Sequence, residues 1–203
     1  MNKLVIIGAR AMARETYRYA VECGMDVKGF LDSDRNALAS HSGYPEILGN
    51  VESYPPKQED VFVCALGNPM EKMRYVDLIR SKAGRFTSIV HPTAYVGQNV
   101  SIGEGCVIAP HATITCDAVI GNHVIMNVNA SFSHDSRCGE GTTISPGCNI
   151  AGRCSLGARV FLGIGAILLP DVTLGDDVFV AAGACVTQSF EAGRLMGVPA
   201  KRR

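Results

Sequence analysis

Residues 96–114 read V-G-Q-N-V-S-I-G-E-G-C-V-I-A-P-H-A-T-I, and every sixth position of this stretch is apolar. With 47% of all residues apolar, seventeen matches in a row would arise by chance on the order of 10⁻⁶ of the time, so the repeat outweighs local propensities. The spacing runs without a miss through Val90, Val96, Ile102, Ile108, Ile114, Ile120, Met126, Phe132, Cys138, Ile144, Ile150, Leu156, Leu162, Leu168, Leu174, Val180 and Val186, which we call the anchors.

A six-residue period fits neither an α-helix nor simple strand alternation, but it is the period of parallel β-helices built from short strands. The position four residues after each anchor is mostly small, as at Ala112, Ala130 and Ser136. The position directly after the anchor is often glycine, where the backbone bends with little room. The pattern therefore predicts a narrow prism with small residues in its interior.

The first 84 residues have a different rhythm, in which short apolar runs alternate with amphipathic segments. Strands followed by helices indicate a small parallel, Rossmann-like α/β sheet. We therefore predict an α/β domain over residues 1–84 and a β-helix with a C-terminal tail over residues 85–203. The expected strands are residues 4–8, 27–31 and 61–66, and the expected helices are residues 11–22 and 69–81.

In such parallel sheets, ligands bind beyond the carboxyl ends of the strands. The turn after the first strand retains one glycine of a dinucleotide-binding fingerprint, which argues against a nicotinamide cofactor. A strand-to-helix turn can still hold a phosphate on its free amides, or it can be a packed turn without a ligand. The predicted acceptor-binding residues are Gly8, Arg10, Ala11, Met12, Asp32, Gly67 and Asn68.

Charge and cysteine content exclude several classes of partner. Nineteen basic and nineteen acidic residues leave no net charge to attract nucleic acid or a membrane surface. The apolar run near the N-terminus is too short for a signal peptide or a membrane span, so we expect a cytoplasmic protein. The eight cysteines lack metal-ligand spacing, and several occupy interior positions of the repeat, so we expect no metal site.

The chain resembles the left-handed β-helix, hexapeptide-repeat acyltransferases. Within them it is similar to bacterial sugar O- and N-acetyltransferases, such as sialic-acid O-acetyltransferases and UDP-4-amino-sugar N-acetyltransferases. The resemblance implies coils of eighteen residues, a sugar nucleotide in the N-terminal domain, a homotrimer, and acetyl-CoA in the groove between subunits. It rests on V-I-I-G-A at 5–9, F-L-D at 30–32, A-L-G-N at 65–68, I-V-H-P-T-A-Y-V-G at 89–97, S-H-D at 133–135 and G-V-P-A-K at 197–201.

The resemblance places the catalytic histidine at His134, followed by the acidic Asp135. An imidazole suits the reaction because its pKa lies near neutral pH, where it can take a proton from an attacking amine or hydroxyl. Asp135 either orients His134 or forms an ordinary surface ion pair with Arg153, its neighbour one coil along. The other histidines, His41, His91, His111 and His123, are expected to be structural or solvated.

Eighteen residues after His134 comes Gly152, which should lie beside the histidine and offer a backbone amide to the thioester. The resemblance assigns acetyl-CoA contacts to Thr143, Gly152, Ile164 and Ala182.

Two positions depart from the family pattern. Arg10-Ala11-Met12 replaces a turn with glycine and histidine, so Arg10 either pairs with an acceptor phosphate or the domain takes another acceptor. Thr143 replaces the histidine of a close relative.

These features predict an acetyltransferase that moves an acetyl group from acetyl-CoA directly to an amino or hydroxyl group of a nucleotide-activated sugar. One alternative is O-acetylation of free sialic acid or another sugar hydroxyl. A γ-carbonic-anhydrase-like lyase fits poorly, because no two histidines of the repeat have the spacing of that family. A non-catalytic sugar-binding scaffold is the remaining alternative.

Overall fold

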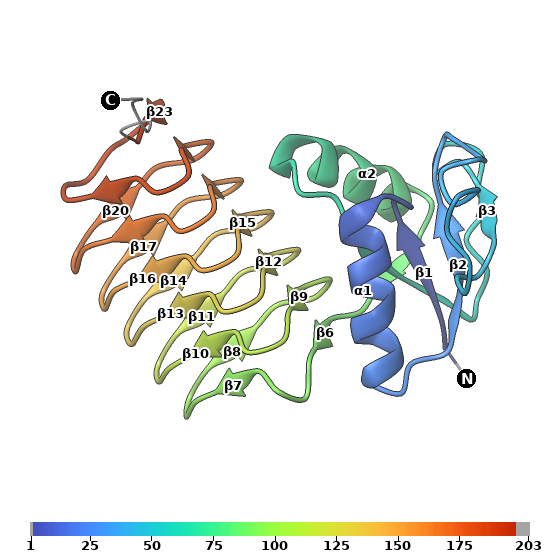
Figure 1. Cartoon of the computed structure of the whole chain (residues 1–203), viewed down its shortest axis with the longest axis horizontal. Coiled ribbons are helices and arrows are strands. Elements are labelled where there is room, and N and C mark those ends of the chain that lie inside the picture. Colours follow the sequence, from blue (N-terminus) through green and yellow to red (C-terminus); the bar gives the residue numbers. More distant parts are fainter. Residues whose placement is uncertain (1, 198–203) are drawn as a thin grey trace.

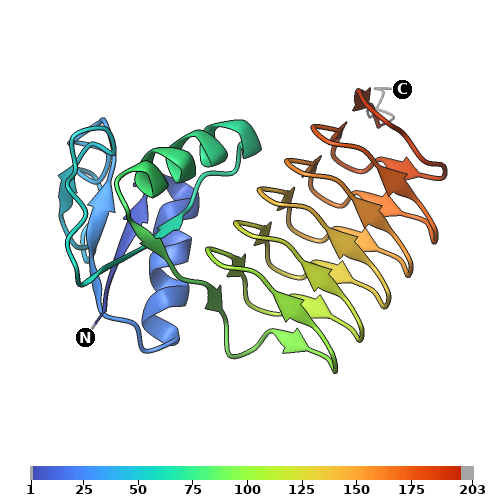
Figure 2. The same cartoon turned by 180° about the vertical axis from the view of Figure 1, so that it is seen from behind.

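The computed structural model describes residues 2–197 and contains an α/β domain followed by a β-helix (Figure 1). The G-V-P-A-K tract at 197–201 lies, beyond Gly197, outside the described residues. Figure 2 shows from the opposite side that helix α1 lies between the sheet of the α/β domain and the first coils of the β-helix.

The α/β domain holds one parallel sheet with the strand order β3-β2-β1-β4-β5, so the order reverses at β1. Both predicted helices and the predicted strand over residues 27–31 match the structure residue for residue. The sequence analysis missed β3 and extended the third strand two residues too far. The elements are β1 (Lys3–Ile7), α1 (Ala11–Glu22), β2 (Val27–Leu31), β3 (Ile47–Gly49), β4 (Asp60–Cys64), α2 (Pro69–Ser81) and β5 (Arg85–Phe86).

Strand β5 lies just past the domain boundary expected at residue 84. It pairs in parallel with β4, so the sheet of the α/β domain continues through Phe86. The next strand, Ile89–Val90, already pairs with the β-helix. The passage between the two parts therefore falls between Phe86 and Ile89.

The β-helix is left-handed and consists of two-residue strands in three parallel sheets, which we call its first, second and third faces. The first face holds β6 (Ile89–Val90), β9 (Val107–Ile108), β12 (Ile125–Met126), β15 (Thr143–Ile144), β18 (Phe161–Leu162), β21 (Phe179–Val180) and β23 (Arg194–Leu195). The second holds β7 (Tyr95–Val96), β10 (Thr113–Ile114), β13 (Ser131–Phe132), β16 (Asn149–Ile150), β19 (Ile167–Leu168) and β22 (Cys185–Val186). The third holds β8 (Ser101–Ile102), β11 (Val119–Ile120), β14 (Arg137–Cys138), β17 (Ser155–Leu156) and β20 (Thr173–Leu174).

Strand pairing confirms the eighteen-residue coil, since β13 pairs Ser131 with Asn149 and the same offset recurs along every face. The exception is β23, where Arg194 pairs with Phe179. The anchors from Ile108 onward are buried in one continuous core. Val90 and Val96 are 37% and 38% exposed, so the sequence pattern overstated the core at this end, where no earlier coil covers it.

The two parts share a buried interface. Ile89, Val107 and Ile125 point outward from the first face and belong to the same apolar cluster as Ala13 and Ala20 of α1. Burying this surface stabilises one fixed arrangement of the two parts. The α/β domain therefore lies against the first face.

Polar contacts flank this interface at both helices. Arg80 of α2 donates from Nη2 to Nε2 of His123 at 2.9 Å and to Glu104 and Glu140 at 3.1 Å each. Near the end of α1, Glu22 lies 2.6 Å from Nε2 of His91. The α/β domain is thus held at two edges of the first face.

Candidate active site

A cavity of about 470 Å³ lies at the carboxyl ends of β1, β2 and β4. This is the point where the strand order reverses, the usual place for a ligand in such sheets. Six of the seven predicted acceptor-binding residues line it: Gly8, Arg10, Ala11, Met12, Asp32 and Gly67. We call it the acceptor cavity.

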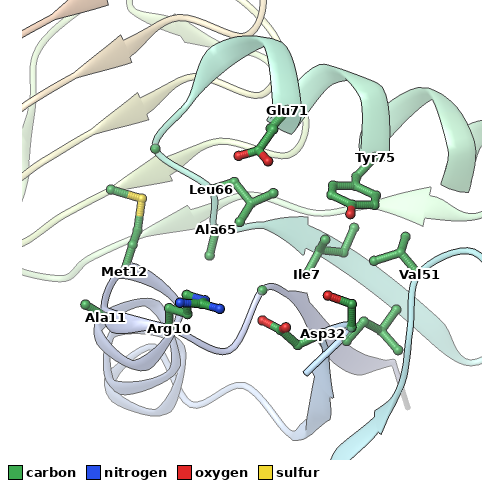
Figure 3. Close-up of a pocket in the computed structure, with 14 residues that line it drawn as sticks. Ile7, Arg10, Ala11, Met12, Asp32, Val51, Ala65, Leu66, Glu71 and Tyr75 are labelled. Carbon is green, nitrogen blue, oxygen red and sulfur yellow. The ribbon is translucent and has the colours of Figure 1, made fainter. Parts of the chain in front are cut away.

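Charged side chains from the start of α1, from the turn after β2 and from α2 meet in the acceptor cavity. Figure 3 shows the Arg10 guanidinium extending from the start of α1 toward Asp32, with Glu71 and Tyr75 facing them from α2. Within residues 2–197, Arg10 makes no ion pair or side-chain hydrogen bond. A cation without a protein partner beside free helix amides is suited to an anionic group.

Asp32 and Asn68 have local structural roles. Asp32 accepts a hydrogen bond from the amide of Ala9 at 2.9 Å, which holds the turn after β1, and one from the amide of Asp34 at 3.0 Å within the turn after β2. Asn68 does not line the acceptor cavity. Its Oδ1 caps α2 by accepting from the amides of Met70 and Glu71, and this cap accounts for an asparagine before Pro69. The structure thus separates Asn68 from the other predicted acceptor residues.

A second cavity, of about 520 Å³, lies between the start of α1 and the first face of the β-helix. Thr143, Ile164 and Ala182, three of the four predicted acetyl-CoA contacts, converge here. Ala11, Met12 and Gly67 line both cavities, so the two spaces adjoin. We call this second space the donor groove.

The donor groove also contains residues that the sequence analysis missed. Phe161 and Phe179 stack with ring centroids 5.1 Å apart, and Arg194 lies over the Phe179 ring at 3.9 Å. The eighteen-residue spacing after Thr143 leads to both aromatic residues and could have identified them. The remaining newly found lining residues are Glu15, Asn127, Ser145, Pro146 and Gly163.

His134 lies at the corner between the second and third faces, directly after β13. Its Nδ1 lies 2.7 Å from Oδ2 of Asp135. An ionised carboxylate can only accept, so Nδ1 of His134 carries the hydrogen and donates a hydrogen bond to Asp135. The other nitrogen, Nε2, is then left with a free lone pair and can act as a base.

The coil spacing correctly placed Gly152 beside His134. The Arg153 amide donates to the His134 carbonyl at 2.9 Å, and a Cβ added to Gly152 would lie 2.5 Å from both Cε1 and Nε2 of the imidazole. Real Cβ atoms do not approach so closely, so the imidazole occupies the space of the missing side chain. The Gly152 amide makes no hydrogen bond with any described residue.

Asp135 does not form the ion pair with Arg153 that the sequence left open. Arg153 instead makes two bonds to Asp171, at 2.7 and 2.8 Å, and Asp117 accepts from Asn99 at 2.8 Å. Asp135 has a φ of +59°, a turn conformation that favours Asp, Asn and Gly. The residue therefore fits a structural turn, and its carboxylate is bonded to His134.

Two other histidines of the repeat have structural partners. His91 lies against Glu22, whose pKa is lowered chiefly by this contact. His123 is fully buried, and burial, with the nearby cations Arg80 and Lys72, lowers its pKa to about 3. Arginine can only donate, so Nε2 of His123 is the acceptor and the imidazole is neutral. Both residues hold the two parts of the chain together.

His134 and the donor groove occupy different corners of the prism. His134 and Gly152 follow strands of the second face, whereas Ile164 and Ala182 follow strands of the first face. The second face lies between these corners. One chain therefore does not bring His134 and the donor groove to the same point.

No three His, Cys, Asp or Glu side chains among residues 2–197 lie together in a way that could hold a metal ion. Neither helix of that range is long and apolar enough to cross a membrane.

Known proteins match both parts of the chain. Residues 87–116 and 153–188 match the family model described as bacterial transferase hexapeptide (six repeats), and residues 3–79 match the PglD N-terminal domain. PerB from Caulobacter crescentus, solved with CoA and GDP-perosamine, is 31% identical with a TM-score of 0.89, covering 99% of this chain and 97% of that chain. The chain belongs to the bacterial sugar acetyltransferases with hexapeptide repeats.

Two further relatives agree with this membership. The acetyltransferase domain of PglB from Neisseria gonorrhoeae is 26% identical with a TM-score of 0.88, and the match covers 99% of each chain. The GDP-perosamine N-acetyltransferase of Escherichia coli O157:H7 is 27% identical over 140 residues, which are 66% of this chain. That match spans 63% of the curated relative's length.

The comparisons confirm three expectations at the level of the family. The fold is the expected left-handed β-helix behind an α/β domain. The relatives are enzymes of the acetyltransferase class, as predicted. Solved relatives hold CoA or acetyl coenzyme A, the expected co-substrate.

Proposed function

We propose that this protein transfers an acetyl group from acetyl-CoA to the amino group of a nucleotide-activated sugar, with His134 as the general base. The observation that carries the proposal is the junction of the two cavities. The acceptor cavity and the donor groove meet at Ala11, Met12 and Gly67, so an acceptor and a thioester bound in them would point toward one another. Two GDP-perosamine relatives make a GDP-linked amino sugar the first acceptor to test.

The acceptor cavity suits a nucleotide diphosphate. Arg10 and the free amides at the start of α1 provide positive charge for phosphate oxygens. The sugar would then extend past Met12 toward the donor groove. Acetyl-CoA would lie along Thr143, Ile164 and Ala182, with the Phe161–Phe179 stack as an apolar wall.

The proposed chemistry is a direct transfer. The amine nitrogen attacks the thioester carbonyl carbon while Nε2 of His134 removes a proton from the amine. The carbon–sulfur bond then breaks, and the protonated imidazole returns this proton to the leaving sulfur, so CoA is released as its thiol. Asp135 holds Nδ1 protonated, which keeps Nε2 free for this step. The unpaired Gly152 amide beside the imidazole supports its role as a donor to the developing oxyanion.

The separation of His134 from the donor groove supports a homotrimer as the working form. A symmetric ring would set the His134 corner of one subunit beside the donor groove of the next and complete the site. Sedimentation equilibrium at micromolar concentration should therefore give about three times the chain mass of 21.6 kDa. A monomer that retains full activity would contradict the shared site.

A thiol-release assay tests the proposed function. Acetyl-CoA is combined with a panel of GDP-, UDP- and dTDP-linked 4-amino sugars and with free sialic acid, and CoA release is followed. We expect release with a nucleotide-linked amine and none with sialic acid. Turnover with sialic acid alone would support hydroxyl transfer instead, and no release with any acceptor despite acetyl-CoA binding would leave a non-catalytic sugar-binding scaffold.

A further inference from the structure

A buried lysine joins the α/β domain to the donor groove. Lys72 of α2 is completely inaccessible to solvent, and its ammonium crosses to β15. Its Nζ donates to the Thr142 carbonyl at 3.1 Å and to Oγ1 of Thr143 at 2.9 Å. Among the described residues it has no carboxylate partner. Burial lowers the pKa of Lys72 to about 8.

A buried cation without a counter-ion is costly, and replacing it with an apolar side chain is often neutral or stabilising. Packing alone therefore does not account for an ammonium here. The titratable groups that interact with Lys72 are His123, which is neutral, and the thiols of Cys64, Cys106 and Cys138, whose burial raises their pKa values and keeps them neutral. The shorter of the two hydrogen bonds of Lys72 is with Thr143.

Thr143 links this contact to the donor groove. It is 1% exposed and lines the groove, and its hydroxyl oxygen accepts from Lys72. A hydroxyl that accepts one bond keeps a proton to donate. No acceptor for that proton occurs among the described residues, so the proton is available to a ligand on the groove side.

We propose that Lys72 is a positioning residue that orients the Thr143 hydroxyl to donate a hydrogen bond to a carbonyl oxygen of acetyl-CoA. This inference rests on the proposed function of the donor groove. The pantetheine amides and the thioester all present carbonyl acceptors. Met12, Phe161 and Phe179 of the groove are apolar, and Asn127 already donates to the Ile144 carbonyl. The lysine thereby couples the seating of the α/β domain to the binding of the acyl donor.

A double-mutant cycle tests the coupling. Thr143→Val removes the hydroxyl and keeps the shape, and Lys72→Met removes the ammonium with little change in length. We expect each single change to raise the acetyl-CoA Kd measured by calorimetry about threefold to tenfold, the size of one hydrogen bond. The double variant should bind no more weakly than Thr143→Val alone, because Lys72 acts through that hydroxyl.

Three controls make the result decisive. Lys72→Arg keeps a donor and should restore most of the affinity. The acceptor KM should stay unchanged in Thr143→Val, and a rise confined to the acceptor KM would overturn the assignment to acetyl-CoA. If Lys72→Met lowers the Tm but not the acetyl-CoA affinity, and the drop in Tm is the same whether residue 143 is threonine or valine, Lys72 has only a structural role. If Lys72→Met does not fold, Thr143→Val and Lys72→Arg still decide.

The proposed function can fail separately from this inference. Wild-type protein that binds no acetyl-CoA would refute the proposed function. Wild-type protein that binds acetyl-CoA, with Thr143→Val binding it equally well, would refute only the positioning role.

Discussion

The β-helix and the α/β domain organise their functional groups in different ways. In the β-helix, one repeat places Gly152 directly against His134, so neighbours in space follow from an eighteen-residue offset in sequence. In the α/β domain, the acceptor cavity combines turns from three strands and side chains from α2, which no fixed offset relates. A repeat therefore predicts which residues are neighbours, whereas a parallel α/β sheet predicts the strand ends at which a ligand binds but not the side chains that α2 adds, such as Glu71 and Tyr75.

The largest expected effect comes from His134, because it is the proposed base of the repeat region. We expect His134→Ala to lower kcat by about 10² or more, with little change in acetyl-CoA affinity. The measurement is steady-state CoA release together with the Kd for acetyl-CoA. His111→Asn is the matched control, since His111 is an exposed histidine of another coil. A folded His134→Ala protein with normal turnover would eliminate the base.

Gly152→Ala should have the next largest effect. Gly152 does not have a positive φ, and the three heavy atoms nearest to a methyl group there all belong to the imidazole of His134. Because the new Cβ would lie 2.5 Å from Nε2, the imidazole must move, and we expect kcat to fall about tenfold to a hundredfold.

Repeating Gly152→Ala in a variant that lacks the histidine shows whether the loss of kcat comes from the displaced imidazole. In protein that already carries His134→Ala, Gly152→Ala should have little further effect on kcat. An equal further loss would mean that Gly152 acts independently of the histidine, for example through its amide alone.

Arg10 tests the less predictable region. We expect Arg10→Ala to raise the acceptor KM about tenfold and to leave the acetyl-CoA KM unchanged, because its guanidinium is available to a phosphate in the acceptor cavity. Arg14→Ala, one turn further along α1 and outside both cavities, is the control. Equal KM values in the two variants would favour an acceptor without phosphate.

His123 tests the contact between the two regions through the pH dependence of stability. The pKa of His123 in the folded state, about 3, lies below the ordinary value. As the pH falls, His123 is therefore protonated in the unfolded chain at a higher pH than in the folded protein. The free energy of unfolding should therefore decrease below about pH 6.5, by at most about 1.4 kcal/mol per pH unit. Urea denaturation between pH 7 and pH 5 measures this slope.

The comparison variant is His123→Asn, which suits the positive φ of +55° at this position. We expect it to be less stable at pH 7 but to show a shallower slope. His111→Asn should retain the wild-type slope. A slope that is unchanged in His123→Asn would assign the acid sensitivity to other groups.

Much of the fold and part of the site could be predicted from the sequence. The anchors are local and periodic, and each packs against the residue one coil away, so the register and the His134–Gly152 contact follow from counting. The helices over residues 11–22 and 69–81 were predicted for a related reason, since a helical sequence pattern is a local signal. Counting fails at the first coil, where the pattern predicts that Val90 and Val96 are buried but the structure leaves both partly exposed.

The tertiary structure alone decided how the two parts join. Nothing in the spacing of residues along the sequence indicates that Lys72 reaches Thr143, that Arg80 donates a hydrogen bond to His123, or that the two cavities adjoin at Met12. These contacts depend on which face of the β-helix the α/β domain covers. That choice is made by apolar burial and by polar pairs such as Lys72 and Thr143, which are 71 positions apart, and neither leaves a periodic trace in the sequence.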